Sequence, residues 1–284
     1  MPKRLDSTFA LDVLQVLTGR ELEIVEEVAH HPCLSCEDLT VLFNAKSNKA
    51  TSRSLQFLHA MRVLARVNPK WTRSSRVQYF YMLDRVGLLL LSLCWRQNAR
   101  ALQKRLGTVK RQLGALAHTV EINRFFLKLL AESRLYESHE LEVWQSETQS
   151  LTRFDGKRGK SMLRPDGYGV YRIDGSRFRF FLEWDRGNSV MEKYRAKFTR
   201  YAAFYDAVRR NPEQFSIGIP SLWVVTVSNQ REDFILDTIN RLSWEYAIDI
   251  PVFTTVKSLT AGGVLEPIWR TMQEPGRRCR FHPG

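Results

Sequence analysis

Apolar residues recur at helical spacing in the first part of the chain. Leu22, Val25 and Val28 repeat in TGRELEIVEEVAHHP until Pro32 ends the pattern. A short helix, CEDLTVLF, is expected next, with Ser35 as its N-cap. A third helix is predicted over KATSRSLQFLHAMRVLARV. Its apolar stripe consists of Leu55, Leu58, Met61 and Leu64.

The following segment, NPKWTRSSRVQYFYML, has the pattern of a hairpin. An extended run leads to a Ser-rich turn at 74–75, and residues Val77 to Leu83 alternate as a strand does. Three helices, the last one basic, followed by a hairpin are the plan of a winged helix-turn-helix. We therefore expect a winged-helix DNA-binding domain over residues 1–90.

A heptad pattern follows this domain. Its apolar positions are Trp95, Ala99, Leu102, Leu106, Val109, Leu113, Leu116 and Val120. The pattern predicts a linking helix over 91–117. Gly107 and Gly114 each weaken a helix by about 1 kcal/mol, so a dimeric coiled coil and packing within one chain both remain open.

Helices and strands alternate in the rest of the chain. The pattern predicts a helix around EINRFFLKLLAESR, a strand LEVWQSE, a charged loop RFDGKRGKS, and a hairpin turning at Asp174-Gly175. A helix over about 190–209, the strand SLWVVTVS, the helix REDFILDTINRLSWEY and the strand IPVFTTVK complete an α/β sheet domain over 118–260. Residues 261–284 are expected to be a flexible tail. The fold class is α+β with two domains.

The net charge of +13 is concentrated near the N-terminus. Residues 46–111 contain 15 basic residues and a single acid, Asp84, and the window 46–83 has no acid. A basic helix and wing favour double-stranded DNA as partner over a merely solvated surface. The candidates for the groove are Lys49, Ser52, Arg53 and Gln56. The candidates for phosphate contacts are Lys70, Arg73 and Arg76.

Several other classes of protein are disfavoured. The longest apolar run, GLLLLSLCW at 87–95, is too short to cross a membrane, and the start has no apolar signal-peptide core, so a cytoplasmic location is expected. Four cysteines make no disulfide framework. HHPCLSC at 30–36 contains a CxxC pair, but no second pair follows at zinc-binding spacing. The chain has no GxSxG, HExxH or GxxxxGK[ST] motif.

Acidic residues mark one end of the predicted C-terminal hairpin. In FFLEWDRG, Glu183 and Asp185 lie on the same face of a strand because side chains alternate. Asp166, at the start of the preceding strand, is expected near Glu183. Three converging carboxylates would suit a hard cation such as Mg²⁺ or Mn²⁺. The alternative is an ordinary strand whose acids surface at its end, with Asp185 paired to Arg186 or Arg200.

The order of these motifs resembles a known family. Pro-Asp opening one strand and Glu closing the next is similar to the PD-(D/E)xK nuclease fold. HTVEIN at 118–123, RPDG at 164–167, FFLEWDRG at 180–187 and KFTRY at 197–201, behind a winged helix, resemble more closely the replication-relaxation family of bacterial plasmids and integrative elements. This resemblance covers about residues 10–257.

The resemblance implies roles for particular residues. Asp166 and Glu183 would bind the metal with the carbonyl of Trp184, and Asp185 is a further candidate ligand. The position two after Glu183 holds Asp185 in place of lysine, so Lys197 on the next helix would be the catalytic lysine, with Lys193 as the alternative. Additional acids considered are Glu121 and Glu142.

Two functions follow as expectations. The first is a DNA-binding protein acting in replication or relaxation of a plasmid or mobile element, with metal-dependent DNA nicking. The second is a non-catalytic regulator of transcription or replication, whose C-terminal domain serves for dimerisation or recruits a replication protein. Retained acids favour the first, and the substituted lysine favours the second.

Overall fold

A computed structural model describes residues 7–69, 78–107, 109–157, 159–187, 191–215 and 218–282. The chain divides into two compact units, Met1–Leu127 and Lys128–Gly284. The border between them falls inside helix α7 (Val109–Ser133), later in the chain than residue 118, where the second domain was expected to begin. Both units mix helices and strands, so the chain is of the α+β class. No helix in the described parts of the chain is long and apolar enough to cross a membrane.

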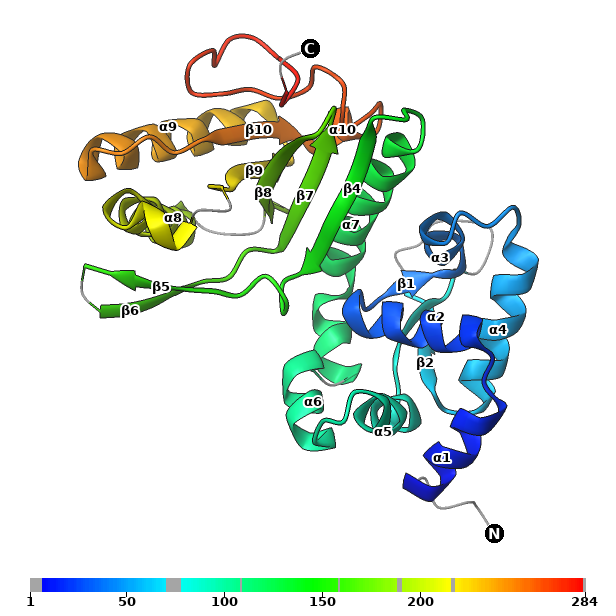
Figure 1. Ribbon diagram of the computed structural model, residues 1–284. Helices are drawn as coiled ribbons and strands as arrows, with labels where there is room; N and C mark the ends of the chain where they lie inside the picture. Colours follow the sequence, from blue (N-terminus) through cyan, green and yellow to red (C-terminus); the bar gives the residue numbers. More distant parts are fainter. Residues whose placement is uncertain are drawn as a thin grey trace. The chain divides into compact units, whose positions relative to one another are not determined.

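The first unit combines helices with a small antiparallel sheet (Figure 1). Its first elements are α1 (Ser7–Val16), α2 (Gly19–His30), β1 (Leu34–Ser35), α3 (Cys36–Leu42), α4 (Asn48–Ala60), β2 (Leu64–Val67) and β3 (Phe80–Leu83). The strands lie in the order β1-β3-β2. Ser35 caps α3 as predicted: its side chain accepts from the backbone N–H of Asp38, whose carboxylate accepts from the backbone N–H of Ser35.

The third predicted helix is shorter than its apolar stripe indicated. Helix α4 ends at Ala60, and Leu64, the last residue of the stripe, belongs to strand β2. Arg62 has a positive φ of 57°, which breaks the helical path. Strand β2 pairs with β3, Leu64 opposite Leu83 and Val67 opposite Phe80. The strand expected from Val77 begins at Phe80, because Gln78 and Tyr79 lie outside it. Val77 and the turn at 74–75 lie outside the described residues.

The predicted linking helix is not continuous. The segment contains α5 (Arg85–Cys94), α6 (Ala99–Leu106) and the start of α7. Asn98 caps α6 with its side chain, and Gly107 ends it at a φ of 85°. Leu102, Leu116 and Val120 are buried, whereas Leu113 is 41% exposed. The heptad positions therefore do not form one uninterrupted seam.

The second unit is built on a mixed sheet with the order β10-β9-β8-β7-β4. Its strands are β4 (His139–Ser146), β7 (Gly167–Ile173), β8 (Ser176–Trp184), β9 (Ser221–Thr226) and β10 (Val252–Val256). β4, β7 and β8 are antiparallel neighbours, and β8, β9 and β10 run parallel. Asp174 and Gly175 both have positive φ, so the predicted tight turn between β7 and β8 is confirmed.

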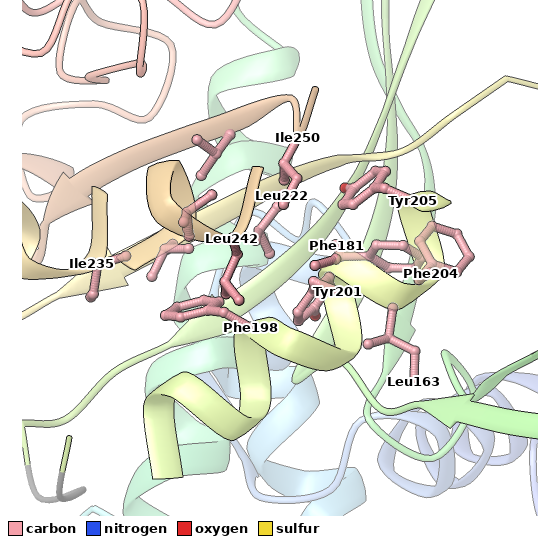
Figure 2. Packing of buried hydrophobic residues seen from close by; sticks show 14 of the residues in the cluster. Leu163, Phe181, Phe198, Tyr201, Phe204, Tyr205, Leu222, Ile235, Leu242 and Ile250 are labelled. Carbon is pink, nitrogen blue, oxygen red and sulfur yellow. The ribbon is translucent and has the colours of Figure 1, made fainter. Parts of the chain in front are cut away.

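Helices cover one face of this sheet. They are α8 (Met191–Arg210) and α9 (Asn229–Tyr246). Figure 2 shows aromatic residues of α8, among them Phe198 and Phe204, packed with Phe181 of β8, Leu222 of β9 and Leu242 of α9. A short 3-10 turn, η1 (Pro212–Phe215), follows α8. The apolar stripe of α8 therefore fixes the position of its polar residues against the end of β8.

Residues 261–282 pack on the opposite face, so the expectation of a flexible tail is wrong for them. Trp269 is fully buried and Phe281 is 5% exposed. Both rings contact Trp223, with centroids 4.7 and 4.5 Å from the Trp223 ring. Residue Thr254 pairs with Arg270 as a backbone bridge. The Pro/Gly-rich composition concealed these two aromatic anchors. A one-turn helix, α10 (Lys257–Thr260), precedes them.

The charged segment RFDGKRGKS is part of a hairpin and not a loop. Strands β5 (Thr152–Gly156) and β6 (Gly159–Leu163) form a separate two-stranded sheet. Phe154 and Leu163 are buried in the core under α8. The charges made the segment look like a loop, although its inward positions are apolar.

Candidate functional site

Asp166 and Glu183 lie side by side at one end of the β7–β8 hairpin. The register places Gly167 opposite Leu182, and the Asp166 N–H donates to the Leu182 carbonyl at 3.0 Å. The Asp166 carboxylate accepts a hydrogen bond of 2.8 Å from the Trp184 N–H. This bond holds the Asp166 side chain toward the end of β8, where Glu183 also lies.

Lys197 of α8 brings a positive charge to both acids. Its Nζ lies 3.6 Å from Oδ2 of Asp166 and forms an ion pair with Oε2 of Glu183. The Glu183 side chain is 3% exposed and the Asp166 side chain 12%, whereas Lys197 is 33% exposed. Lys193, the alternative lysine, is exposed. We call Asp166, Glu183 and Lys197 the acid–lysine cluster.

Tyr201 completes the surroundings of Glu183. Its hydroxyl donates a hydrogen bond to Oε1 of Glu183, and the tyrosine is 1% exposed. Tyr201 stands four residues after Lys197, so both side chains lie on the same face of α8. The sequence analysis treated Tyr201 only as part of the apolar stripe. Its position four residues after the candidate Lys197 could have indicated that its hydroxyl reaches the same acid.

Burial dominates the electrostatics of the cluster. It raises the pKa of Glu183 to about 8, with the Asp166 charge adding to the rise and Lys197 opposing it. Burial lowers the pKa of Lys197, but the charges of Asp166 and Glu183 outweigh it and keep that pKa above its usual value. The cluster therefore holds Lys197 charged, and the charge of Lys197 limits how far burial raises the pKa of Glu183.

Asp185 has separate partners. Its Oδ2 accepts from Thr226 Oγ1 at 2.7 Å and from Nε of Arg231 on α9, and its Oδ1 accepts from the Gly187 N–H at 2.7 Å. Tyr194 also donates to it. Burial raises the pKa of Asp185, but these hydrogen bonds, led by Arg231, outweigh burial and lower it. Arg231 of α9 forms an ion pair with Asp185, a partner that the sequence had not indicated.

These contacts correct the expected pocket of three carboxylates. In the described part of the chain, no three His, Cys, Asp or Glu side chains gather closely enough to hold a metal ion. Glu142 is paired with Arg172 and Arg177 on the sheet, and Glu121 belongs to the other unit. The Cys33–Cys36 pair likewise joins no metal-binding group among these residues, and both are free thiols.

The two carboxylates of the cluster still fit one hard cation. Oxygen ligands from one or two carboxylates, completed by water and substrate phosphates, are typical of Mg²⁺ sites. The partial exposure of Asp166 and Lys197 leaves the cluster accessible from solvent. Asp166 and Glu183, which share Lys197 as ion-pair partner, would be the protein ligands. Asp185 would not be one, because its ion pair is with Arg231 and not with Lys197.

The candidate DNA-binding residues of the first unit lie on α4. Its apolar face, Thr51, Leu55 and Leu58, is buried. The outward positions Lys49, Arg53 and Gln56 are exposed, and Ser52 is half-buried. Lys70, Arg73 and Arg76 lie outside the described residues.

These observations define the class of the protein. It is an α+β protein of two compact units, and the second unit contains the acid–lysine cluster. The family model for replication-relaxation matches residues 25–218, and the chain belongs to this family. Membership agrees with a role in replication or relaxation of a plasmid or mobile element. No curated protein and no solved structure matches the chain.

The matched region contains HTVEIN, residues 118–123, within α7. Asn123 of this motif is 2% exposed, and its side-chain amide donates to the Pro32 carbonyl at 2.8 Å. That bond ties α7 to the turn after α2 within the first unit. The match also contains α4 and the whole acid–lysine cluster.

Proposed function

We propose that this protein binds duplex DNA through its first unit and nicks DNA with its second, using one divalent cation held by Asp166 and Glu183. The observation that carries the nicking proposal is the position of Lys197, whose Nζ lies within ion-pair distance of both acids. Two acids and a lysine at the end of a hairpin are what the nuclease resemblance requires.

Each residue has a distinct role in this proposal. A bound Mg²⁺ or Mn²⁺ would neutralise phosphate charge and lower the pKa of a water molecule. Asp166 is oriented for binding by the Trp184 N–H. Lys197, a third exposed, can turn its ammonium toward a phosphate oxygen and stabilise negative charge there. Tyr201 positions Glu183.

The DNA-binding part of the proposal rests on the first unit. The order α2-β1-α3-α4-β2-β3 and the sheet order β1-β3-β2 agree with a winged helix, in which α4 would enter the major groove. Lys49 and Arg53 are one helical turn apart on the exposed side of α4. We therefore assign them to DNA contacts.

The central test incubates supercoiled plasmid with the protein and Mg²⁺ or Mn²⁺. Nicking by the wild type that is lost in Asp166→Asn and in Glu183→Gln supports the proposal. Glu192→Gln is the matched control, because it neutralises an exposed acid of the same helix. Absence of nicking by the wild type on every plasmid and with both cations would reject it.

DNA binding is tested separately. Lys49→Ser/Arg53→Ser should reduce the magnitude of the slope of log K against log salt by about 1.8, at about 0.9 for each positive charge withdrawn from the DNA. Arg96→Ser/Arg100→Ser removes the same charge from exposed positions of the same unit. Equal effects of the two pairs would contradict the assignment to α4.

One observation favours a second candidate, the non-catalytic regulator. Glu183 is nearly inaccessible, and both of its oxygens are engaged, one by Tyr201 and the other by Lys197. The ammonium group of Lys197 can take the place of a metal ion beside Glu183, and the cluster then only stabilises the fold. In that case Mn²⁺ would not bind, and the acids could be replaced without affecting DNA affinity.

A further inference from the structure

The β5–β6 hairpin has one apolar and one basic face. Phe154 and Leu163 point into the core, and the outward positions of both strands are exposed. The exposed basic residues of the hairpin and its end are Arg153, Lys157, Lys160 and Arg164. Asp155 is the acid that interrupts this face. A two-stranded ribbon of this kind presents positive charge along its length.

Helix α8 anchors the hairpin. The Phe154 ring meets Phe204 edge to face with centroids 5.5 Å apart. Lys157 pairs with Asp206 of α8 at 3.5 Å, and Arg210 donates to the Asp155 carbonyl at 3.4 Å. The hairpin is therefore a fixed part of the second unit, beside α8 (Figure 1).

The basic face continues to the acid–lysine cluster in two ways. Along the chain, Arg164 is followed directly by Pro165 and Asp166. Along α8, Lys193, Lys197 and Arg200 recur at helical spacing, so they share one face of the helix. Lys193 and Arg200 are exposed. Phe204, the next position of this stripe, is the residue that meets the hairpin.

Asp155 and Glu147 form only weak, exposed ion pairs with the basic residues of this face. Lys160 lies 3.7 Å from Asp155, and Arg164 lies 3.6 Å from Glu147. The Lys160 side chain is 92% exposed and that of Arg164 51%. Exposed pairs of this kind contribute about 0–1 kcal/mol, so a phosphate can replace the carboxylate at little cost.

We propose that the basic face of the β5–β6 hairpin and the Lys193–Arg200 stripe of α8 form a second DNA-contact surface, which holds the phosphate backbone of duplex DNA beside the acid–lysine cluster. This inference rests on the proposed function, because it supplies the cluster with its substrate. Long basic side chains around a single exposed apolar residue, Met162, fit a polyanion; protein interfaces are depleted in lysine.

The test measures DNA affinity against salt for the full chain, in EDTA so that no cation-dependent chemistry occurs. All proteins carry Lys49→Ser/Arg53→Ser, which removes the contribution proposed for α4. Arg153→Ser/Lys160→Ser is then added. The matched control is Arg241→Ser/Arg277→Ser, which removes two exposed arginines elsewhere in the same unit. Lys157 is left intact because it pairs with buried Asp206.

We expect the hairpin variant to reduce the magnitude of the slope of log K against log salt by about 1.8, at about 0.9 per phosphate contact. The control should leave the slope unchanged. Equal slopes for the hairpin and control variants would overturn the proposal, as would loss of all DNA binding in the Lys49→Ser/Arg53→Ser background alone. A slope change without plasmid nicking by the wild type would support the DNA surface while rejecting the proposed chemistry.

Discussion

The hydroxyl of Tyr201 donates a hydrogen bond to Glu183 in the interior of the second unit, one helical turn from Lys197. Replacing this tyrosine by phenylalanine leaves a buried carboxylate oxygen without its donor. We expect Tyr201→Phe to lower the free energy of unfolding by about 1–3 kcal/mol, measured by urea denaturation. The loss should be greater at pH 9 than at pH 6, because the donor stabilises ionised Glu183.

Tyr205→Phe is the control for this effect. The Tyr205 hydroxyl, equally buried, donates to the Pro220 carbonyl at 2.7 Å and so serves a partner that does not titrate. We expect a cost of about 0.5–1.5 kcal/mol that does not change between pH 6 and pH 9. Identical pH profiles for the two variants would contradict the role given to Tyr201.

The raised pKa of Glu183 makes stability depend on pH. The folded protein holds the proton up to about pH 8, whereas the unfolded chain releases it near 4.5. This contribution is therefore fully present below pH 4.5 and is lost as pH rises toward 8. Without divalent cations, the wild type should lose stability relative to Glu183→Gln across this range, by about 1.4 kcal/mol per unit of pKa difference.

Urea denaturation of both proteins in EDTA between pH 5 and pH 9 checks this expectation. The difference between the two curves isolates Glu183, because the other titrating groups are common to both proteins. Parallel curves would show that Glu183 ionises at its ordinary pKa and is not buried as described.

Lys197 and Lys193 are four residues apart on α8, but only Lys197 has ion pairs with the two acids. If nicking occurs, Lys197→Ala should reduce its rate by about 100-fold, the loss typical of removing one group that stabilises developing charge. Lys193→Ala should retain the rate within about threefold, because its charge acts on DNA binding and is screened by salt. Single-turnover nicking rates distinguish the two, and the reverse order would reassign the lysine.

Asp185 and Arg231 should matter for stability and not for cation binding. Arg231→Ala leaves a buried carboxylate without its cation, and we expect it to cost about 3 kcal/mol of unfolding free energy. Mn²⁺ affinity, measured by calorimetry, should fall in Asp166→Asn and stay unchanged in Asp185→Asn. A loss of Mn²⁺ binding in Asp185→Asn would restore Asp185 as a ligand.

The proximity of Asp166 and Glu183 could be predicted from the sequence because it depends on local geometry. The two-residue turn at Asp174-Gly175 fixes the hairpin register, so the distance from the turn determines which residues face each other. Lys197 could be named for a similar reason, because helical spacing places it one turn before Tyr201, and both side chains reach Glu183.

The hydrogen-bond partners of Asp185 could not be predicted in this way. Its partners, Thr226 and Arg231, come from β9 and α9, and a parallel neighbour strand has no short turn to fix its register. The end of α4 was missed because Leu64 fits a helical stripe as well as a strand. Its pairing with Leu83 decided the outcome.

The position of β9 has a consequence for work with fragments. The family match ends at residue 218, but β9 begins at Ser221 and lies between β8 and β10 in the sheet. A fragment ending with the match would lack β9, β10 and α9, so β8 would become an exposed edge strand and α8 would lose its apolar partners Leu222 and Leu242. Such a fragment should aggregate on expression, so the borders of the family match are not the borders of a foldable piece.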